Sequence, residues 1–325
     1  MNHFLKKKAK NFWVRKMSEH VSVLLNEAIE YLNIKSDGVY VDLTLGRAGH
    51  SGEILKRLTN GLLIAFDKDI EAINESRVKL DKIGNKYLVF HEDFRNLKEV
   101  LKKNGIDKVD GIIADLGVSS PQFDEDERGF SYRYNGKLDM RMDSRQTLTA
   151  FDVVNTYSLE HLTQIFKEYG EEKYAYNIAK NIVNNRPINT TLELVEIIKN
   201  SKPMRELEKK GHPAKQTFQA IRIEVNDELN ALKEMLKQAL DVIDVNGRIV
   251  IITFHSLEDR IVKTVFKEAS KAVGSRHNVY SLPSEEDKPK YRLINNKVIL
   301  PSLEEMETNH RSKSAKMRVI ERVKL

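Results

Sequence analysis

The first third of the chain alternates short apolar runs with segments of helical periodicity. Apolar runs rich in β-branched and aromatic residues predict buried strands at 39–43, 62–66, 87–90 and 111–114. Apolar residues at helical spacing predict helices at 23–32, 51–58, 70–80 and 97–103. Strands that alternate with helices in this way predict an α/β fold with a doubly wound parallel sheet.

The alternation stops between residues 123 and 220. Turn-rich sequence is followed there by segments of helical periodicity at 159–169, 173–184 and 192–201. The pattern then resumes with a predicted helix at 224–242, a strand at 247–254, a helix at 257–270, a polar loop at 272–300 and a terminal strand at 315–323. We therefore expect a sheet domain in two parts, 18–122 and 221–325, with a mainly helical substrate domain inserted at 123–220.

Residues 1–17 are basic and lack the continuous apolar core of a secretory signal. We expect a disordered tail, or sequence upstream of a start at Met17; an arm that touches RNA is the alternative. No stretch approaches the roughly 20 consecutive apolar residues of a membrane span, so we expect no membrane association.

The amino-acid composition excludes several kinds of site and reaction. The 325 residues include no cysteine, which excludes disulfides, thiolate metal sites and any methylation that proceeds by thiolate attack on a pyrimidine ring. The formal net charge of +6 is compatible with a polyanionic partner but does not require one. No His, Asp or Glu cluster has convincing metal-ligand spacing, so we expect no required metal.

The loop after the first predicted strand is the first candidate for ligand binding. Gly46 and Gly49 follow a strand and precede a helix, where backbone can approach a ligand closely. Their spacing differs from the G-x-G-x-x-G of nicotinamide-dependent oxidoreductases. The Asp-x-Thr-x-Gly order that begins at Asp42 is closer to the loop that methyltransferases place under the amino-acid end of S-adenosylmethionine; a plain turn is the alternative.

Acidic residues end the other predicted strands. Asp67 lies 25 positions after Asp42 (67 − 42) and is placed to accept both ribose hydroxyls, unless it is only a solvated acid. Phe94 offers a ring beside an adenine. Asp115 ends the fourth strand, where methyl donor and acceptor meet in such enzymes. A non-catalytic RNA-binding protein would leave these acids unexplained.

Several longer runs resemble one family. They are His20–Glu27 (HVSVLLNE), Asp115–Gln122 (DLGVSSPQ), Arg128–Ser131 (RGFS), Leu138–Asp143 (LDMRMD), Phe218–Ile223 (FQAIRI), Phe254–Lys263 (FHSLEDRIVK) and Arg311–Ala315 (RSKSA). In order and spacing, from about residue 18 to the end, the chain resembles the ribosomal RNA small-subunit methyltransferase H family, also called MraW.

The resemblance implies a class I S-adenosylmethionine-dependent methyltransferase, with a Rossmann-like doubly wound sheet and an inserted helical domain. It implies methylation of a cytidine N4 in the decoding region of 16S rRNA, within the small subunit and in the cytoplasm. Monomer and homodimer both stay open. The cofactor contacts implied by motif, together with Gly46 of the loop, are Ala48, Gly49, His50, Asp67, Phe94, Asp115 and Gln122.

Four positions depart from the family pattern. Ala48 stands where the family commonly has Gly, and Ser22 and His310 replace Pro. Lys215-Gln216 replaces a typical Thr-Arg pair, which puts a phosphate contact at 216 in doubt. None of these positions falls in the 115–122 run.

The mechanism that we expect uses Asp115 and the turn after it. A cytosine amine is a poor nucleophile, and acceptors that build electron density on its nitrogen help it to react. We expect Asp115 and backbone carbonyls near Ser119, Ser120 and Pro121 to hold the amine; the alternative is that these residues form only a turn. The alternative methyl acceptors are another nucleic acid or a protein; the resemblance speaks against them, whereas the local chemistry does not.

Candidate RNA contacts are Arg128, Phe130, Arg141, His255 and Arg260. An aromatic ring can stack on an unpaired base, and guanidinium groups can bind phosphates. The alternative for the first three is a surface loop with packed aromatics. For His255 we prefer a hydrogen-bonded structural residue to a general base, and the alternative for Arg260 is a place in a charged helix start.

Overall fold

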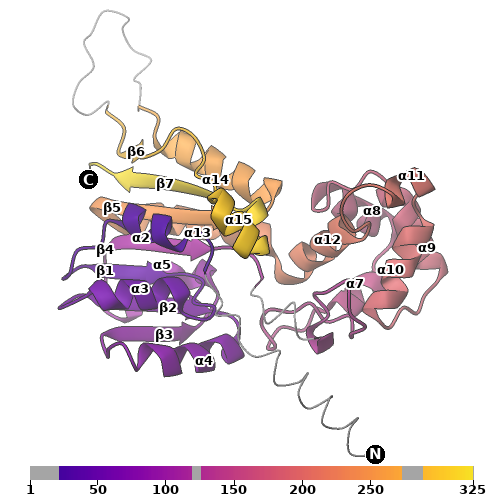
Figure 1. Cartoon of the computed structure of the whole chain (residues 1–325), viewed down its shortest axis with the longest axis horizontal. Coiled ribbons are helices and arrows are strands. Elements are labelled where there is room, and N and C mark those ends of the chain that lie inside the picture. The colour runs from indigo at the N-terminus through magenta and orange to yellow at the C-terminus, as the bar shows by residue number, and fades with distance from the viewer. Residues whose placement is uncertain (1–21, 119–125, 273–287, 325) are drawn as a thin grey trace, which may run out of the picture.

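The computed structural model describes residues 22–118, 126–272 and 288–324 (Figure 1). Its described strands form one seven-stranded sheet in the order β3-β2-β1-β4-β5-β7-β6. β1 (Val39–Asp42), β2 (Leu62–Asp67), β3 (Tyr87–His91), β4 (Val109–Asp115) and β5 (Ile243–Thr253) are parallel. β7 (Lys316–Arg322) and β6 (Tyr291–Leu293) complete the sheet as antiparallel strands.

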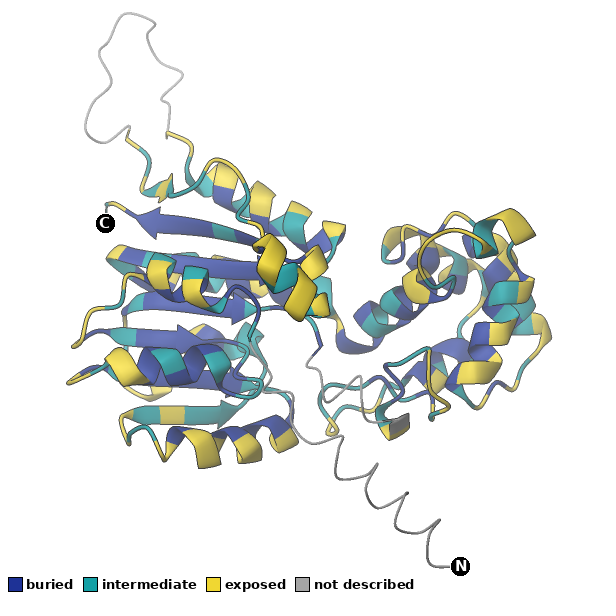
Figure 2. Cartoon of the chain, viewed as in Figure 1, coloured by how far each residue is buried: buried dark blue, intermediate teal, exposed yellow. Residues whose placement is uncertain are grey.

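Helices cover both faces of the sheet, because alternate residues of the central strands point to opposite sides. Val41 packs in a core with α5 (Leu97–Lys103), α13 (Glu228–Val242) and α14 (Ser256–Ala269). Its neighbour Tyr40 packs in a second core with α2 (Leu25–Leu32), α3 (Gly49–Arg57) and α4 (Ile70–Leu80). Buried strands lie between helices whose outer faces are exposed, with α15 (Leu303–Thr308) beside them (Figure 2).

A separate helical lobe lies beside the carboxyl ends of the parallel strands (Figure 1). It comprises α7 (Ala150–Thr156), α8 (Leu159–Glu168), α9 (Ala175–Asn184), α10 (Thr191–Asn200), α11 (Met204–Leu207) and α12 (Lys215–Asn226). Its apolar core includes Phe166, Ile178 and Phe218. The boundary expected at residue 220 falls inside α12, which runs from this lobe toward the sheet.

Most predicted elements are present, and two predictions are wrong. The helix expected at 224–242 is two helices, α12 and α13, separated by Asp227 in a left-handed conformation (φ 48°). The loop expected at 272–300 contains the short strand β6. The tail at 1–17 lies outside the described residues. Within the described ranges, no helix combines the length and apolar character needed to cross a bilayer.

Candidate functional site

A cavity opens at the carboxyl ends of the parallel strands, on the side that faces the helical lobe. In open α/β sheets this edge, where the strand order reverses between β1 and β4, is where ligands bind. Its lining combines glycine loop backbone with carboxylates, cations and aromatic rings, among them Thr44, Gly46, Gly49, His50, Asp67, Lys68, Phe94, Asp115, Glu228, Phe254, Glu258 and Arg311.

The loop between β1 and α3 is held by the buried Asp42 side chain. Its carboxylate accepts hydrogen bonds from the Thr44 backbone N–H (3.0 Å) and from the Ser51 hydroxyl (2.7 Å). Gly46 and Ala48 adopt left-handed conformations (φ 49° and 58°) that turn the chain into α3. A Cβ at Gly49 would lie 1.8 Å from Ser22 Oγ, so glycine is needed for this close approach. The loop thereby places backbone at the cavity wall.

Asp67 ends β2 beside this loop. Its Oδ2 accepts the Gly46 N–H (2.8 Å) and its Oδ1 accepts the Asp69 N–H (2.9 Å). Burial raises the pKa of Asp67 to about 6, although both backbone hydrogen bonds oppose the rise. Each oxygen keeps a lone pair beyond its single backbone bond, so the carboxylate can accept further hydrogen bonds from hydroxyl groups in the cavity.

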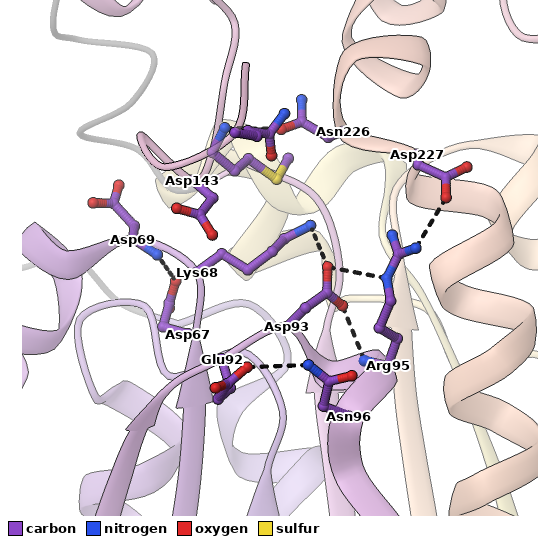
Figure 3. Close-up of polar contacts among 12 residues, drawn as sticks. Asp67, Lys68, Asp69, Glu92, Asp93, Arg95, Asn96, Asp143, Asn226 and Asp227 are labelled. Atoms are coloured by element: carbon purple, nitrogen blue, oxygen red, sulfur yellow. Dashed lines mark hydrogen bonds and ion pairs between the residues drawn. The ribbon is translucent and has the colours of Figure 1, made fainter. Parts of the chain in front are cut away.

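A charged network joins the ends of β2 and β3 to the helical lobe (Figure 3). Lys68 Nζ lies 3.2 Å from Asp93 Oδ2 and 5.7 Å from the centre of the Phe94 ring, within cation–π range. Arg95 approaches the same Asp93 oxygen (3.3 Å) and pairs with Asp227 (3.0 Å) at the break between α12 and α13. The network fixes Phe94 at the cavity and links it to that break.

Asp115 ends β4 and has a different environment. Its backbone N–H donates to Thr44 Oγ1 (2.6 Å), but its buried Oδ1 has no hydrogen-bond partner among the described residues. Burial raises the pKa of Asp115 to about 6, while nearby His50 and Arg311 favour its ionised form. A buried acceptor without a partner is costly, which makes Oδ1 suited to a ligand that brings a hydrogen-bond donor or a positive charge.

His50 and Arg311 support this corner. His50 Nε2 lies 3.2 Å from the Val23 carbonyl oxygen, and burial lowers the pKa of its ring. The Arg311 guanidinium donates to the Val118 carbonyl, just before residues 119–125. Ser119, Ser120, Pro121 and Gln122 lie outside the described residues, so their roles stay predictions.

The three RNA-contact candidates of the 128–141 segment are engaged with the protein itself. Arg128 donates to Asp69 (3.1 Å) and to the carbonyls of Arg141 and Met142. Arg141 pairs with Asp139 (2.7 Å), and Phe130 is only 3% exposed, in the lobe core. The contact with Asp69 holds the segment beside the cavity. RNA binding by these side chains stays a prediction.

His255 and Arg260 lie at the start of α14. His255 is the N-cap residue and forms a capping box with Glu258. Arg260 Nη2 pairs with Glu171 of the helical lobe (2.9 Å), and Glu171 also accepts from the Ser256 hydroxyl (2.6 Å). The candidate RNA contact Arg260 therefore joins the two lobes in this structure.

Sequence reasoning did not select several cavity residues. Arg311 and Glu258 stood in two of the recognised runs but received no role in the site. Lys68 lies next to the selected Asp67. Glu228 had no signal, because the break at Asp227 that brings α13 to the cavity was not predicted.

The chain is similar to proteins of one family over almost its full length. The MraW methylase family matches residues 17–323. A protein from Mycoplasma mycoides subsp. mycoides SC named ribosomal RNA small subunit methyltransferase H is 53% identical over 94% of this chain and its own full length. A protein of the same name from Mesoplasma florum is 51% identical with the same coverage.

Similarity to solved structures is weaker. A structure described as a putative rRNA methylase from Clostridium thermocellum aligns over 93% of this chain and 99% of its own, with 10% identity and a TM-score of 0.44, and the family assignment does not depend on it. The strand order of the sheet agrees with the family that the sequence matches indicate. The chain belongs to the MraW methylase family, has the class I methyltransferase fold and uses S-adenosyl-L-methionine as its cofactor.

Proposed function

We propose that the chain transfers a methyl group to the N4 amine of a cytidine in the decoding region of 16S ribosomal RNA, in the cytoplasm and within the small subunit. The observation that carries the proposal is the buried Oδ1 of Asp115, which lies at the cavity beside the glycine loop and has no hydrogen-bond partner among the residues that the structure describes. The names of relatives at 51–53% identity support ribosomal RNA as the substrate. The net charge of +6 suits it.

The acceptor groups of the cavity fit this cofactor. S-adenosyl-L-methionine carries hydroxyl and ammonium donors and a positive sulfur, and the cavity offers the carboxylates of Asp67 and Asp115. We assign Asp67 to the ribose, Phe94 to the adenine, and the loop of Gly46, Ala48, Gly49 and His50 to the amino-acid end. Gln122 is a further proposed contact. When bound, the cofactor would supply an electrophilic methyl group; its transfer to the acceptor nitrogen would break the carbon–sulfur bond and release one proton from the nitrogen.

The residues of the chain activate the acceptor by position. Asp115 Oδ1 accepts an N–H of the amine, which increases electron density on the nitrogen and fixes its orientation. Carbonyls near Ser119, Ser120 and Pro121 are proposed to hold the amine together with Asp115. Arg311 binds the carbonyl of Val118, the last described residue before this run.

The test uses small subunits from cells that lack the gene. Purified protein and labelled cofactor are incubated with these particles, and the RNA is digested to identify the modified nucleoside. We expect label in N4-methylcytidine, and none with Asp115→Ala. Asp110→Ala is the matched control, because Asp110 lies at the opposite end of β4 and binds Lys35 and Val39 instead. Cofactor binding with label in another nucleoside, or in none, would refute the assignment.

A further inference from the structure

The ends of β4 and β5 form a part of the cavity that the cofactor assignments leave unused. The proposed cofactor residues follow β1, β2 and β3, with Asp115 at the end of β4. Parallel strands end at one edge, so the next group along this edge is the turn from β5 into α14. Phe254 and Glu258 of that turn line the same cavity, on the side of Asp115 away from the cofactor residues.

Glu258 is an unusually placed acid. It is 2% exposed, and its Oε2 accepts the backbone N–H groups of Phe254 (2.8 Å) and His255 (3.3 Å). These two bonds complete the cap of α14 with one oxygen. The other oxygen, Oε1, takes no part in the cap and lies 3.1 Å from His255 Nε2.

The His255 ring points into the same group of side chains. Its side chain is 10% exposed, and its Nδ1 faces the Glu258 backbone N–H (3.5 Å). Nε2 is buried and, among the described residues, has no partner with hydrogen-bond geometry. Glu228, His255 and Glu258 each offer one atom that could bind a metal ion, and these three atoms lie within 4.8 Å of one another. A buried nitrogen without a partner is costly, so this cluster is arranged around a group that the protein does not supply.

The charges in the cluster decide which group suits it. Arg222 binds both oxygens of Glu228 (2.8 and 2.9 Å), which neutralises that acid and occupies it. No lysine or arginine of the described residues forms an ion pair with Glu258, whose recorded partner is His255. A metal ion would have to compete with Arg222 for Glu228. Glu258 Oε1 has only the His255 ring as its recorded partner, so it can accept a further hydrogen bond from a donor in the cavity.

We propose that Glu258 is a catalytic residue that accepts a hydrogen bond from the exocyclic amine of the target base, and that His255 is a positioning residue that orients Glu258; both assignments rest on the proposed function. Asp115 and Glu258 each bind one N–H in the plane of the base. The nitrogen lone pair, perpendicular to that plane, then points toward the methyl group. The same carboxylate repels the O4 carbonyl of uracil, so Glu258 also selects cytosine.

Glu258→Gln tests this selection because glutamine keeps an oxygen for the α14 cap and replaces the second acceptor, Oε1, by an NH₂ donor. The affinity of the protein is measured for small subunits that carry cytidine or uridine at the methylated position. S-adenosylhomocysteine is present in both measurements. We expect the unchanged protein to favour cytidine by about tenfold or more. In Glu258→Gln we expect a ratio near 1 or reversed, with Tm and S-adenosylhomocysteine affinity unchanged.

Two further variants separate catalysis from helix capping. Asp259→Asn is the matched control, because Asp259 binds Arg318 (2.7 Å) on β7, and its cytidine preference should equal that of the unchanged protein. His255→Asn keeps an N-cap side chain and should lower kcat while the KM for the particle stays constant.

Three results would overturn the inference. If the unchanged protein methylates cytidine but Glu258→Gln keeps both kcat and the cytidine preference, Glu258 has only a structural role while the proposed function stands. If a chelator abolishes activity and Zn²⁺ or Mg²⁺ restores it in the unchanged protein alone, the cluster binds a metal. If the unchanged protein methylates no cytidine, the proposed function fails and Glu258 loses its assigned partner.

Discussion

Cofactor affinity should depend on pH through the two raised carboxyl pKa values. Burial raises the pKa of both Asp67 and Asp115 to about 6, compared with 3.8 for an exposed aspartate. The ionised forms are the ones that accept hydroxyl hydrogen bonds and attract the positive groups of the cofactor. Protonation as the pH falls through 6 should therefore weaken binding.

The size of the effect follows from the fraction ionised. A group with a pKa of about 6 is about 90% ionised at pH 7 and about 10% ionised at pH 5. The Kd should rise about tenfold over this range if one carboxylate must be ionised, and about 100-fold if both must be. The α-amino group of the ligand, with a pKa near 8, stays protonated throughout this window.

Isothermal titration calorimetry with S-adenosylhomocysteine between pH 5 and pH 7 measures this dependence. Asp67→Asn should bind more weakly at pH 7 and lose about tenfold of the pH dependence, because one titrating group is gone. Glu99→Gln is the control, since Glu99 is an exposed partner of Lys103 and neither residue lines the cavity. A Kd that stays constant from pH 5 to pH 7 in the unchanged protein would refute the assignment of ionised carboxylates to the ligand.

Three further predictions concern the parts around the cavity. Arg128→Gln removes the contact with Asp69 and should weaken S-adenosylhomocysteine binding several-fold by calorimetry, whereas Glu71→Gln, at the exposed end of the same group, should not. Phe166→Ala should destabilise the helical lobe by about 3–5 kcal/mol, because the ring is fully buried; hydrogen exchange should then rise in α7–α12 while the sheet stays protected. Glu171→Ala removes the bonds to Ser256 and Arg260 that join the lobes, and should broaden the distance distribution measured by small-angle X-ray scattering with little change in Tm.

The sheet could be predicted because its signals are local. The segments 70–80 and 97–103 were predicted as helices and coincide with α4 and α5. Asp69 caps the first of these through the Glu71 N–H, a signal visible in the sequence. Three of the four apolar runs of the first third, those of β1, β2 and β4, are buried between two helical layers, which is why they are apolar throughout instead of alternating. The fourth run forms the edge strand β3, where Leu88 is exposed.

The two errors have different physical causes. The break at Asp227 uses neither glycine nor proline; an aspartate adopts the left-handed conformation there, held in place by its contact with Arg95. β6 has three residues and is a strand because it pairs with β7. Neither a tolerated left-handed residue nor a three-residue pairing has a periodicity of its own, so both depend on distant parts of the chain.

Some residues of the candidate site could likewise be predicted from local signals, and others depend on distant parts of the chain. Because parallel strands end at one edge, acids at the ends of β1, β2 and β4 could be expected to meet. Asp42 does lie close enough to Asp67 and Asp115 to contribute to the raised pKa of both. Glu228 and Arg311 reach it from α13 and from the segment before β7. Their positions depend on how the helical lobe and the last strands pack, which no local pattern specifies.

Hydrogen bonding distinguishes three acids that the sequence presents as equivalent. Both oxygens of Asp42 are bound by its own loop, through Thr44 and Ser51, so Asp42 shapes the loop. Asp67 binds one backbone N–H with each oxygen and keeps lone pairs for a ligand. Asp115 leaves Oδ1 with no partner among the described residues. Since an unbound buried acceptor costs stability, its retention at the end of β4 is best explained by a partner that arrives with the substrate.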